Sequence, residues 1–229
     1  MEVKESNSAC APGNNYYSSD TVSFNAATQE LTLEYKNIGG TWRAGEVRIL
    51  LGETASFDYG EFTLHVKSVS VYDGSTLVSN KLPPDMVFGF FTFDTTVSHF
   101  EHPYGKEVDF EISHWGDVTN EDVQFLIQPG GVPGPHFPYD KRFFSGGSPQ
   151  TFDQGGHFYK ITWNPGEISW STDAGGTHTY SYTSDLAHEK CVEDFIQCLP
   201  NNVEVRLNLW NMGGGDLQPN FEQIGRAHV

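Results

Sequence analysis

Short runs in which apolar and polar residues alternate, separated by Gly, Pro, Asn and Asp, make up most of this 229-residue chain. Between Phe62 and Lys67, for example, every second residue is apolar. Successive side chains of a strand point to opposite faces of a sheet, so this period of two predicts β-strands with one buried face. The runs predicted as strands are Thr21–Asn25, Glu30–Tyr35, Val47–Leu51, Phe62–Val71, Val87–Phe93, Val108–Ile112, Val123–Gln128, His157–Trp163, Ile168–Ser171 and Val203–Trp210.

Helical periodicity is nearly absent from the sequence. The best candidate is Ser184–Leu199, where Ser184 is placed to cap the amino end, and we predict a short helix there. Many strands without intervening helices favour an all-β sandwich or barrel. No repeat or linker divides the chain, so residues 1–229 are expected to form one domain, with residues 1–15 flexible.

The stretch Pro129–Pro138 is rich in Pro and Gly and is predicted to be a long irregular loop. Loops of this length in compact domains often carry function. A plain surface connection is an equally good interpretation, and the residues alone do not choose.

The chain is strongly acidic, with 30 Asp and Glu against 13 Lys and Arg and a net charge of -17. Such a surface repels phosphate backbones and anionic lipids, so neither nucleic acid nor a membrane surface is an expected partner. No apolar run reaches the length of about 18 residues that a membrane-spanning helix needs. An uncharged polysaccharide remains compatible, and a monomer is expected.

The cysteine pattern does not indicate a disulfide framework, because Cys10, Cys191 and Cys198 are odd in number. Cys191 and Cys198 could pair across a short loop. The amino-terminal segment is polar and is not a signal peptide, so either the protein is cytosolic or a native signal has been removed and replaced by a Met. The second alternative, a secreted protein, fits the function considered below and is the one expected. Three histidines show no metal-ligand spacing and are interpreted as structural or loop residues: His114, His136 and His157.

Three acids alternate with two apolar residues in the segment Glu107–Glu111. On a strand, Glu107, Asp109 and Glu111 share one face, and their like charges should make them titrate as a coupled set. A solvated outer face is the simpler interpretation. The alternative is a carboxylate pair for glycoside hydrolysis, with one carboxyl as acid and one as nucleophile or base. Four residues span about 13 Å of backbone, so leaning side chains could reach the separation of about 5–5.5 Å that retention requires.

The sequence of Glu107–Glu111 resembles the E-[IVL]-D-x-E signature of glycoside hydrolase family 16. Further segments resemble that family's motifs in the same order, from about Glu46 to Asn211, which is most of the chain. They are Tyr59–Phe62 with Val66–Lys67, Gly89–Phe93, His157–Trp163, Ile168–Trp170 and Asn208–Asn211.

The resemblance implies a concanavalin A-like β-jelly-roll sandwich of two antiparallel sheets with a concave substrate cleft. It also implies a retaining endo-glycosidase in which Glu107 is the nucleophile, Glu111 the general acid/base and Asp109 the assisting carboxylate. No residue is inserted between Asp109 and Glu111, which resembles the lichenase branch, so mixed-linkage β-1,3-1,4-glucan is the expected substrate. No cofactor is needed for this catalysis. Many family members bind a structural calcium ion on the convex face, but no site for it can be assigned here.

The same resemblance suggests residues that bind sugar, although each has a structural alternative. Glu46 and Arg48 resemble a lichenase pair that binds hydroxyls, and they could equally form a strand ion pair. Phe91 and Phe93 share a strand face and could stack on sugar rings or fill a core. Further candidates are Asn208 and Trp210 on one strand face, Trp115 as a cleft wall, and Gln128 where lichenases carry a tyrosine.

Other positions are expected to be structural or depart from the family pattern. Trp163 and Trp170 are predicted to lie in the sandwich core. The segment Met212–Asp216 is shorter than the lichenase loop and lacks its tryptophan, which leaves the subsite preference open. The chain stops at Gly225–Val229, where a full closing strand is expected, so it is truncated or another segment fills the edge.

Two other function classes remain open from the sequence. One is a non-catalytic glucan-binding module on the same jelly roll, although a lectin has no need of three clustered acids. The other is a transglycosylase or a β-1,3-glucanase that uses the same carboxylates.

Overall fold

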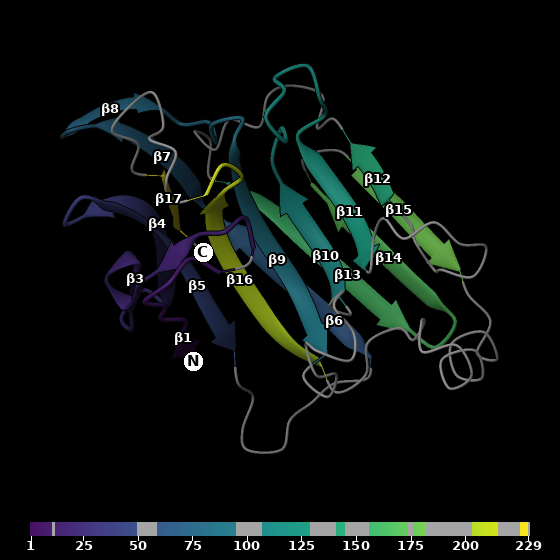
Figure 1. Cartoon of the computed structure of the whole chain (residues 1–229). Coiled ribbons are helices and arrows are strands. Elements are labelled where there is room, and N and C mark those ends of the chain that lie inside the picture. Colours follow the sequence, from purple (N-terminus) through teal and green to yellow (C-terminus); the bar gives the residue numbers. More distant parts are fainter. Residues whose placement is uncertain are drawn as a thin grey trace.

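The alternating runs form strands in the computed structural model, and the strands stack in two layers (Figure 1). The chain folds as a β-jelly-roll sandwich, as predicted, and the strand pairs are antiparallel except one short parallel pair. The structure describes residues 1–10, 12–49, 59–94, 107–128, 141–144, 156–173, 176–181, 203–214 and 225–228.

The first layer is the sheet that carries the acidic segment, and it lies in front in Figure 1. Its strand order is β12-β11-β10-β9-β16-β5, so β9 and β11 flank the central acidic strand β10. The strands are β12 (Lys141–Phe144), β11 (Val123–Gln128), β10 (Glu107–Ile112), β9 (Met86–Asp94), β16 (Val203–Asn211) and β5 (Thr41–Ile49).

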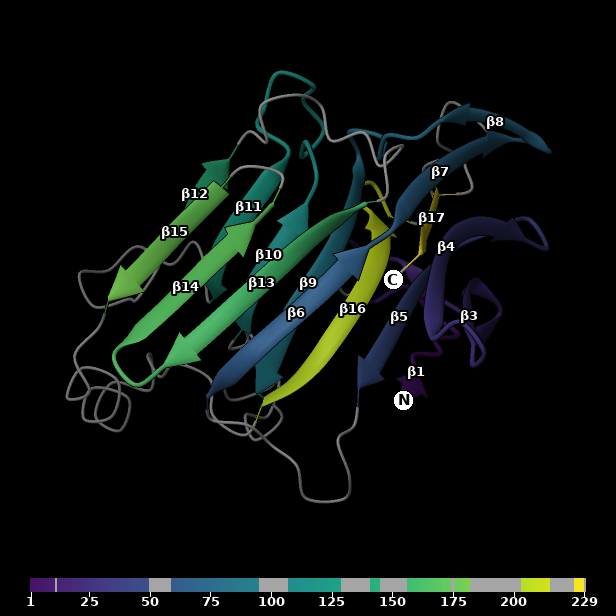
Figure 2. The same cartoon turned by 180° about the vertical axis from the view of Figure 1, so that it is seen from behind.

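The second layer packs behind the first and comes to the front in Figure 2. Its order is β15-β14-β13-β6. The strands are β15 (Gly176–Ser181), β14 (Glu167–Thr172), β13 (His157–Asn164) and β6 (Gly60–Val66).

The remaining strands extend the sandwich beyond β5. Strand β4 forms a hairpin with β5 and pairs with β17, which pairs in turn with β7. Strands β1 and β2 add to β5, β3 adds to β4, and β8 adds to β7. Their bounds, with the one short 3-10 helix η1, are β1 (Glu2–Val3), β2 (Tyr16–Tyr17), η1 (Ser19–Thr21), β3 (Val22–Asn25), β4 (Glu30–Ile38), β7 (Ser68–Asp73), β8 (Thr76–Ser79) and β17 (Gly225–His228).

The core lies between the two layers and is built from the apolar side chains of each alternating run. The ring of Phe110 on β10 contacts Phe125 of the same sheet and Tyr159 of the opposite sheet, with ring centres 4.8 and 4.7 Å apart. Trp163 and Trp170 are both buried, as predicted. Burying such large rings removes apolar surface from water and is the main force that joins the layers.

The predicted strand Phe62–Val71 is two strands, because the alternation slips at Lys67. Val66 and Val69 are both buried although they lie three residues apart, so one extra residue turns the chain over between β6 and β7. Figure 2 shows β7 continuing in the direction of β6. Because of this extra residue, the first part of the run, β6, pairs with β13 in the second layer, and the next part, β7, pairs with β17.

Several strands were not predicted: β1, β2, β8, β12, β15 and β17. All of them except β15 have only two to four residues, too few to show a period. Residues 1–15, expected to be flexible, include β1, which pairs with Val47 and Arg48 of β5. The closing segment forms β17 between β4 and β7. The predicted helix Ser184–Leu199, the loop Pro129–Pro138, His136, Cys191 and Cys198 lie outside the described residues. No helix among those described is long and apolar enough to cross a membrane.

Candidate active site

The three acids of β10 point away from the sandwich core, on one face of the first sheet. Val108 and Phe110, which alternate with them, are buried on the opposite face. The indole Nε1–H of Trp170 reaches from the second layer and donates a 2.9 Å hydrogen bond to the carbonyl oxygen of Asp109. Pairing with β9 and β11 and this contact together fix the backbone from which the acids project.

This acidic face is not an open, solvated surface. Asp109 is only 1% exposed, and Glu107 and Glu111 are half-buried. A water-screened row of acids would be fully exposed, so the simpler sequence interpretation does not hold. Burying an ionised carboxylate raises the free energy of the folded protein unless neighbouring groups compensate its charge.

Glu107 is the carboxyl with the strongest sign of a functional environment. Burial raises its pKa to about 7. A hydrogen bond from the side chain of Asp109 and the charges of Arg206 and Lys4 act in the opposite direction, whereas the charge of Glu46 raises the pKa further. The raised pKa of Glu107 is thus the balance of its burial against the groups that face it.

Glu111 has a different partner. Its Oε2 accepts a 2.6 Å hydrogen bond from Nε2 of Gln124, which lies directly opposite on β11. Gln124 is 1% exposed, so this donor is held in place by packing. Sequence reasoning missed Gln124, because nothing local in β11 shows which residue will face Glu111.

A row of polar residues crosses the sheet beside Glu111. In register, Glu111 lies opposite Gly89 on β9, which lies opposite Asn208 on β16, which lies opposite Glu46 on β5. Position 89 has room only for a glycine, because a Cβ there would lie 2.5 Å from Oδ1 of Asn208. Predicted site residues from separate strands are thus brought onto one line.

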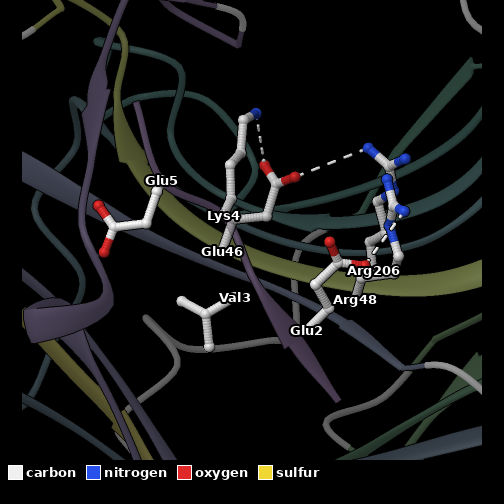
Figure 3. Close-up of a pocket in the computed structure, with 7 residues that line it drawn as sticks. All are labelled: Glu2, Val3, Lys4, Glu5, Glu46, Arg48 and Arg206. Carbon is white, nitrogen blue, oxygen red and sulfur yellow. Dashed lines mark hydrogen bonds and ion pairs between the residues drawn. The ribbon is translucent and has the colours of Figure 1, made fainter. Parts of the chain in front are cut away.

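A network of ion pairs lies further along this face, beyond β9 (Figure 3). Glu204 contacts Arg48 at 2.8 Å and Arg206 at 2.5 Å. Glu46 contacts Lys4 at 3.0 Å and Arg206 at 3.6 Å. Glu46 and Arg48 thus form ion pairs with other residues of the network, and both line a cavity. That cavity has a volume of about 390 Å³ and is lined by Glu2, Val3, Lys4, Glu5, Glu46, Arg48 and Arg206. The role of Glu46 and Arg48 in sugar binding stays a prediction.

The predicted aromatic residues have different surroundings. Phe91 is 8% exposed and lies between Asp109 and Arg206 in register, while Phe93 is more exposed and lies under the Arg206 guanidinium. Trp210 is 8% exposed, and Trp115 packs edge-on against it with ring centres 6.1 Å apart.

Trp210 is largely covered by the amino-terminal segment. A Cβ on Gly13 would lie 2.4 Å from the Trp210 ring, and Gly13 has a φ of +66°, where glycine is favoured. Trp210 therefore supports the wall of the site more than it offers a surface to a ligand. Gln128 lies opposite Glu107 in register, and its side chain is outside what the structure describes.

We compared the chain with known proteins by sequence and by fold. A scan against protein-family models finds no match, and a search of curated proteins finds no relative by sequence. Among solved structures, a Bacillus licheniformis β-glucanase has 19% identity and a TM-score of 0.60, with 99% of this chain and 87% of that chain covered. The laminarinase catalytic domain of Thermotoga petrophila has 14% identity and a TM-score of 0.60, with 93% and 79% covered. A glycoside hydrolase family 16 endo-glucanase from Bacteroides ovatus has 13% identity and a TM-score of 0.61, with 99% and 91% covered.

The chain has the glycoside hydrolase family 16 fold. The resemblance first indicated by Glu107–Glu111 is thereby confirmed at the level of the fold. Within the family 16 fold of this chain, the described residues include no group of three or more His, Cys, Asp and Glu that could hold a metal ion. His114 and His157 make local contacts instead, to the Asn120 carbonyl and the Asp173 carboxylate. The structural calcium ion that the resemblance implied stays a prediction.

Proposed function

We propose that this protein is a retaining endo-glycosidase that hydrolyses a neutral β-glucan. One observation carries the proposal: Glu107, Asp109 and Glu111 project from one face of β10 into a partly desolvated site, and each outer acid has its own partner. Two carboxyls with different environments on one face suit a division into acid and nucleophile. Which acid takes which role follows from the family motif, because a raised pKa taken alone would suit Glu107 as the proton donor.

The proposed mechanism assigns one step to each acid. In the first step the ionised Glu107 attacks the anomeric carbon, while Glu111 donates its proton to the departing glycosidic oxygen. A covalent glycosyl-enzyme results. In the second step Glu111 removes a proton from water, the water oxygen attacks the same carbon, and Glu107 is released as a carboxylate. The side chain of Asp109 lowers the pKa of Glu107 and so favours the ionised nucleophile.

The cavity lies on the β5 and β16 side of this face and is lined by none of the three acids of β10, but its charges are compatible with an uncharged substrate. Its lining holds three carboxylates, Glu2, Glu5 and Glu46, and three cations, Lys4, Arg48 and Arg206. The cations Lys4, Arg48 and Arg206 are each ion-paired with an acid, so they are poorly placed to bind an anionic sugar. An ion-paired carboxylate can still accept a hydrogen bond from a sugar hydroxyl, and an ion-paired Lys or Arg can still donate one to it.

The preferred linkage is proposed from the sequence motif. The absence of an inserted residue between Asp109 and Glu111 favours mixed-linkage β-1,3-1,4-glucan. Among the similar structures, one is described as a β-glucanase and another as a laminarinase, so a β-1,3-glucan is the principal alternative. The proposal treats the protein as a secreted monomer without a catalytic cofactor.

The test is a hydrolysis panel of barley β-glucan, lichenan, laminarin, xyloglucan and agarose, with linkage analysis of the products. We expect mixed-linkage oligosaccharides from the first two, and proton NMR at early times should show the β-anomer. Glu107→Gln should abolish turnover and keep glucan binding. Release of the α-anomer would contradict retention, and a Glu107→Gln variant with more than a few per cent of activity would exclude Glu107 as nucleophile. Longer products formed with an added acceptor sugar would instead identify a transglycosylase.

A further inference from the structure

Arg206 leans out of its own row toward the row of Glu107. In register it lies opposite Phe91 on β9 and Arg48 on β5. Its guanidinium nevertheless lies over the ring of Phe93, with the guanidinium carbon 3.9 Å from the ring centre. Phe93 is the residue of β9 directly opposite Glu107. The Arg206 charge is thus carried toward the proposed nucleophile.

The position of Arg206 is defined on three sides. Its Nε and Nη2 both lie 2.5 Å from Oε1 of Glu204, and its Nη1 lies 3.6 Å from Oε1 of Glu46. The aromatic face of Phe93 supports the guanidinium plane, a favourable cation–π arrangement. Only 14% of the side chain is exposed. A guanidinium held this way acts as a fixed positive charge.

The acids on this face need such a charge. Among the described residues, the charged groups on the face of Glu107 include Asp109 and Glu111 on its own strand, Arg206 and Glu204 on β16, Glu46 and Arg48 on β5, and Lys4 next to β1. The residues of β9 that face Glu107 are the rings Phe91 and Phe93. Arg48 is drawn to Glu204 and Glu2, and Lys4 is drawn to Glu46. Arg206 is the cation whose contacts reach closest to the row of Glu107.

We propose that Arg206 is a positioning residue for Glu107: it holds Phe93 and Glu46 beside the nucleophile and supplies a positive charge that favours the ionised form of the nucleophile. This role rests on the function proposed above. A positioning role differs from that of an ion pair that only stabilises the fold, because the charge of Arg206 must act on Glu107 itself. The direction of the Arg206 effect on the pKa of Glu107, which is downward, agrees with it.

The test measures the ionisation of Glu107 directly. Protein labelled with ¹³C at glutamate carboxyl groups is titrated by NMR, and the signal missing from Glu107→Gln identifies Glu107. Arg206→Met should raise the Glu107 midpoint by about one pH unit, because removing a nearby opposite charge has an effect of that order. Arg206→Gln removes the charge and keeps hydrogen-bond donors, and Arg206→Lys should restore the wild-type midpoint. Lys160→Met, on the outer face of the second layer, is the control and should leave it unchanged.

Activity gives a second readout. With a higher Glu107 pKa, the fraction of ionised nucleophile falls below neutral pH, so kcat/KM of Arg206→Met should drop about tenfold at pH 6. Above pH 8 the variant should approach the wild type. A drop of the same size at every pH, or an unchanged Glu107 midpoint in both Arg206→Met and Arg206→Gln, would overturn the proposal. The titration needs no substrate, so it also decides the role of Arg206 if the wild type hydrolyses no glucan and the proposed function fails.

Discussion

Nε2 of Gln124 donates a 2.6 Å hydrogen bond to Oε2 of Glu111, across the β10–β11 pair. Hydrogen bonds to a carboxyl are directional, so a buried donor fixes the rotamer of the acid as well as its energy. Gln124 thereby orients the residue that must meet the glycosidic oxygen.

Gln124→Leu should separate orientation from binding. Leucine keeps most of the volume but cannot donate, so kcat should fall about tenfold while KM changes less than about twofold. Steady-state kinetics on the best glucan measure both. Thermal unfolding checks that the fold is kept, and an unchanged kcat would show that Gln124 does not orient Glu111 for catalysis.

Gly89→Ala should disturb the row that joins Glu111 to Asn208. The new Cβ would lie 2.5 Å from Oδ1 of Asn208, which has to move, and we expect a loss of about 1–3 kcal/mol in the free energy of unfolding. Asn208→Ala should relieve the clash. The double variant should therefore be more stable than the two single changes predict together, by about 1 kcal/mol in denaturant unfolding. Strict additivity would mean that the strain lies elsewhere.

Glu107→Gln should change how stability depends on pH. In the folded protein the pKa of Glu107 is raised from its ordinary value of 4.5 to about 7, so the native state keeps a proton that the unfolded chain releases. The stability associated with the protonated form is present below pH 4.5 and is lost as the pH rises to 7. The variant is neutral throughout and avoids this loss. Between pH 4 and pH 8 it should gain about 3 kcal/mol relative to the wild type. Parallel curves of unfolding free energy against pH would contradict the raised pKa.

Trp170→Phe should loosen the strand that carries the acids. The ring position is kept, stacked on Phe125, but the hydrogen bond to the Asp109 carbonyl is lost. We expect the free energy of unfolding to fall by about 1–2 kcal/mol, because a buried carbonyl loses a donor. Denaturant unfolding measures this. A variant as stable as the wild type would show that the 2.9 Å contact contributes nothing.

The sequence by itself determined the strands and the acids. Alternation in runs such as Val123–Gln128 depends only on neighbours along the chain, so it predicts both the strand and its core-facing side. The same rule placed Glu107, Asp109 and Glu111 on one face, whereas the two-sheet arrangement followed from the resemblance to a family. The alternation rule failed at Lys67, where one extra residue reverses the faces, and at strands too short to show a period.

Only the tertiary structure decided which residues surround the acids. Gln124 meets Glu111, and Arg206 reaches toward Glu107, because of the register between β10 and its neighbours and because a side chain leans along its strand. Register between distant segments is set by the packing of whole layers, and no local pattern records it. The burial that raises the pKa of Glu107 likewise belongs to the assembled sheet, since a lone strand leaves every carboxylate in water.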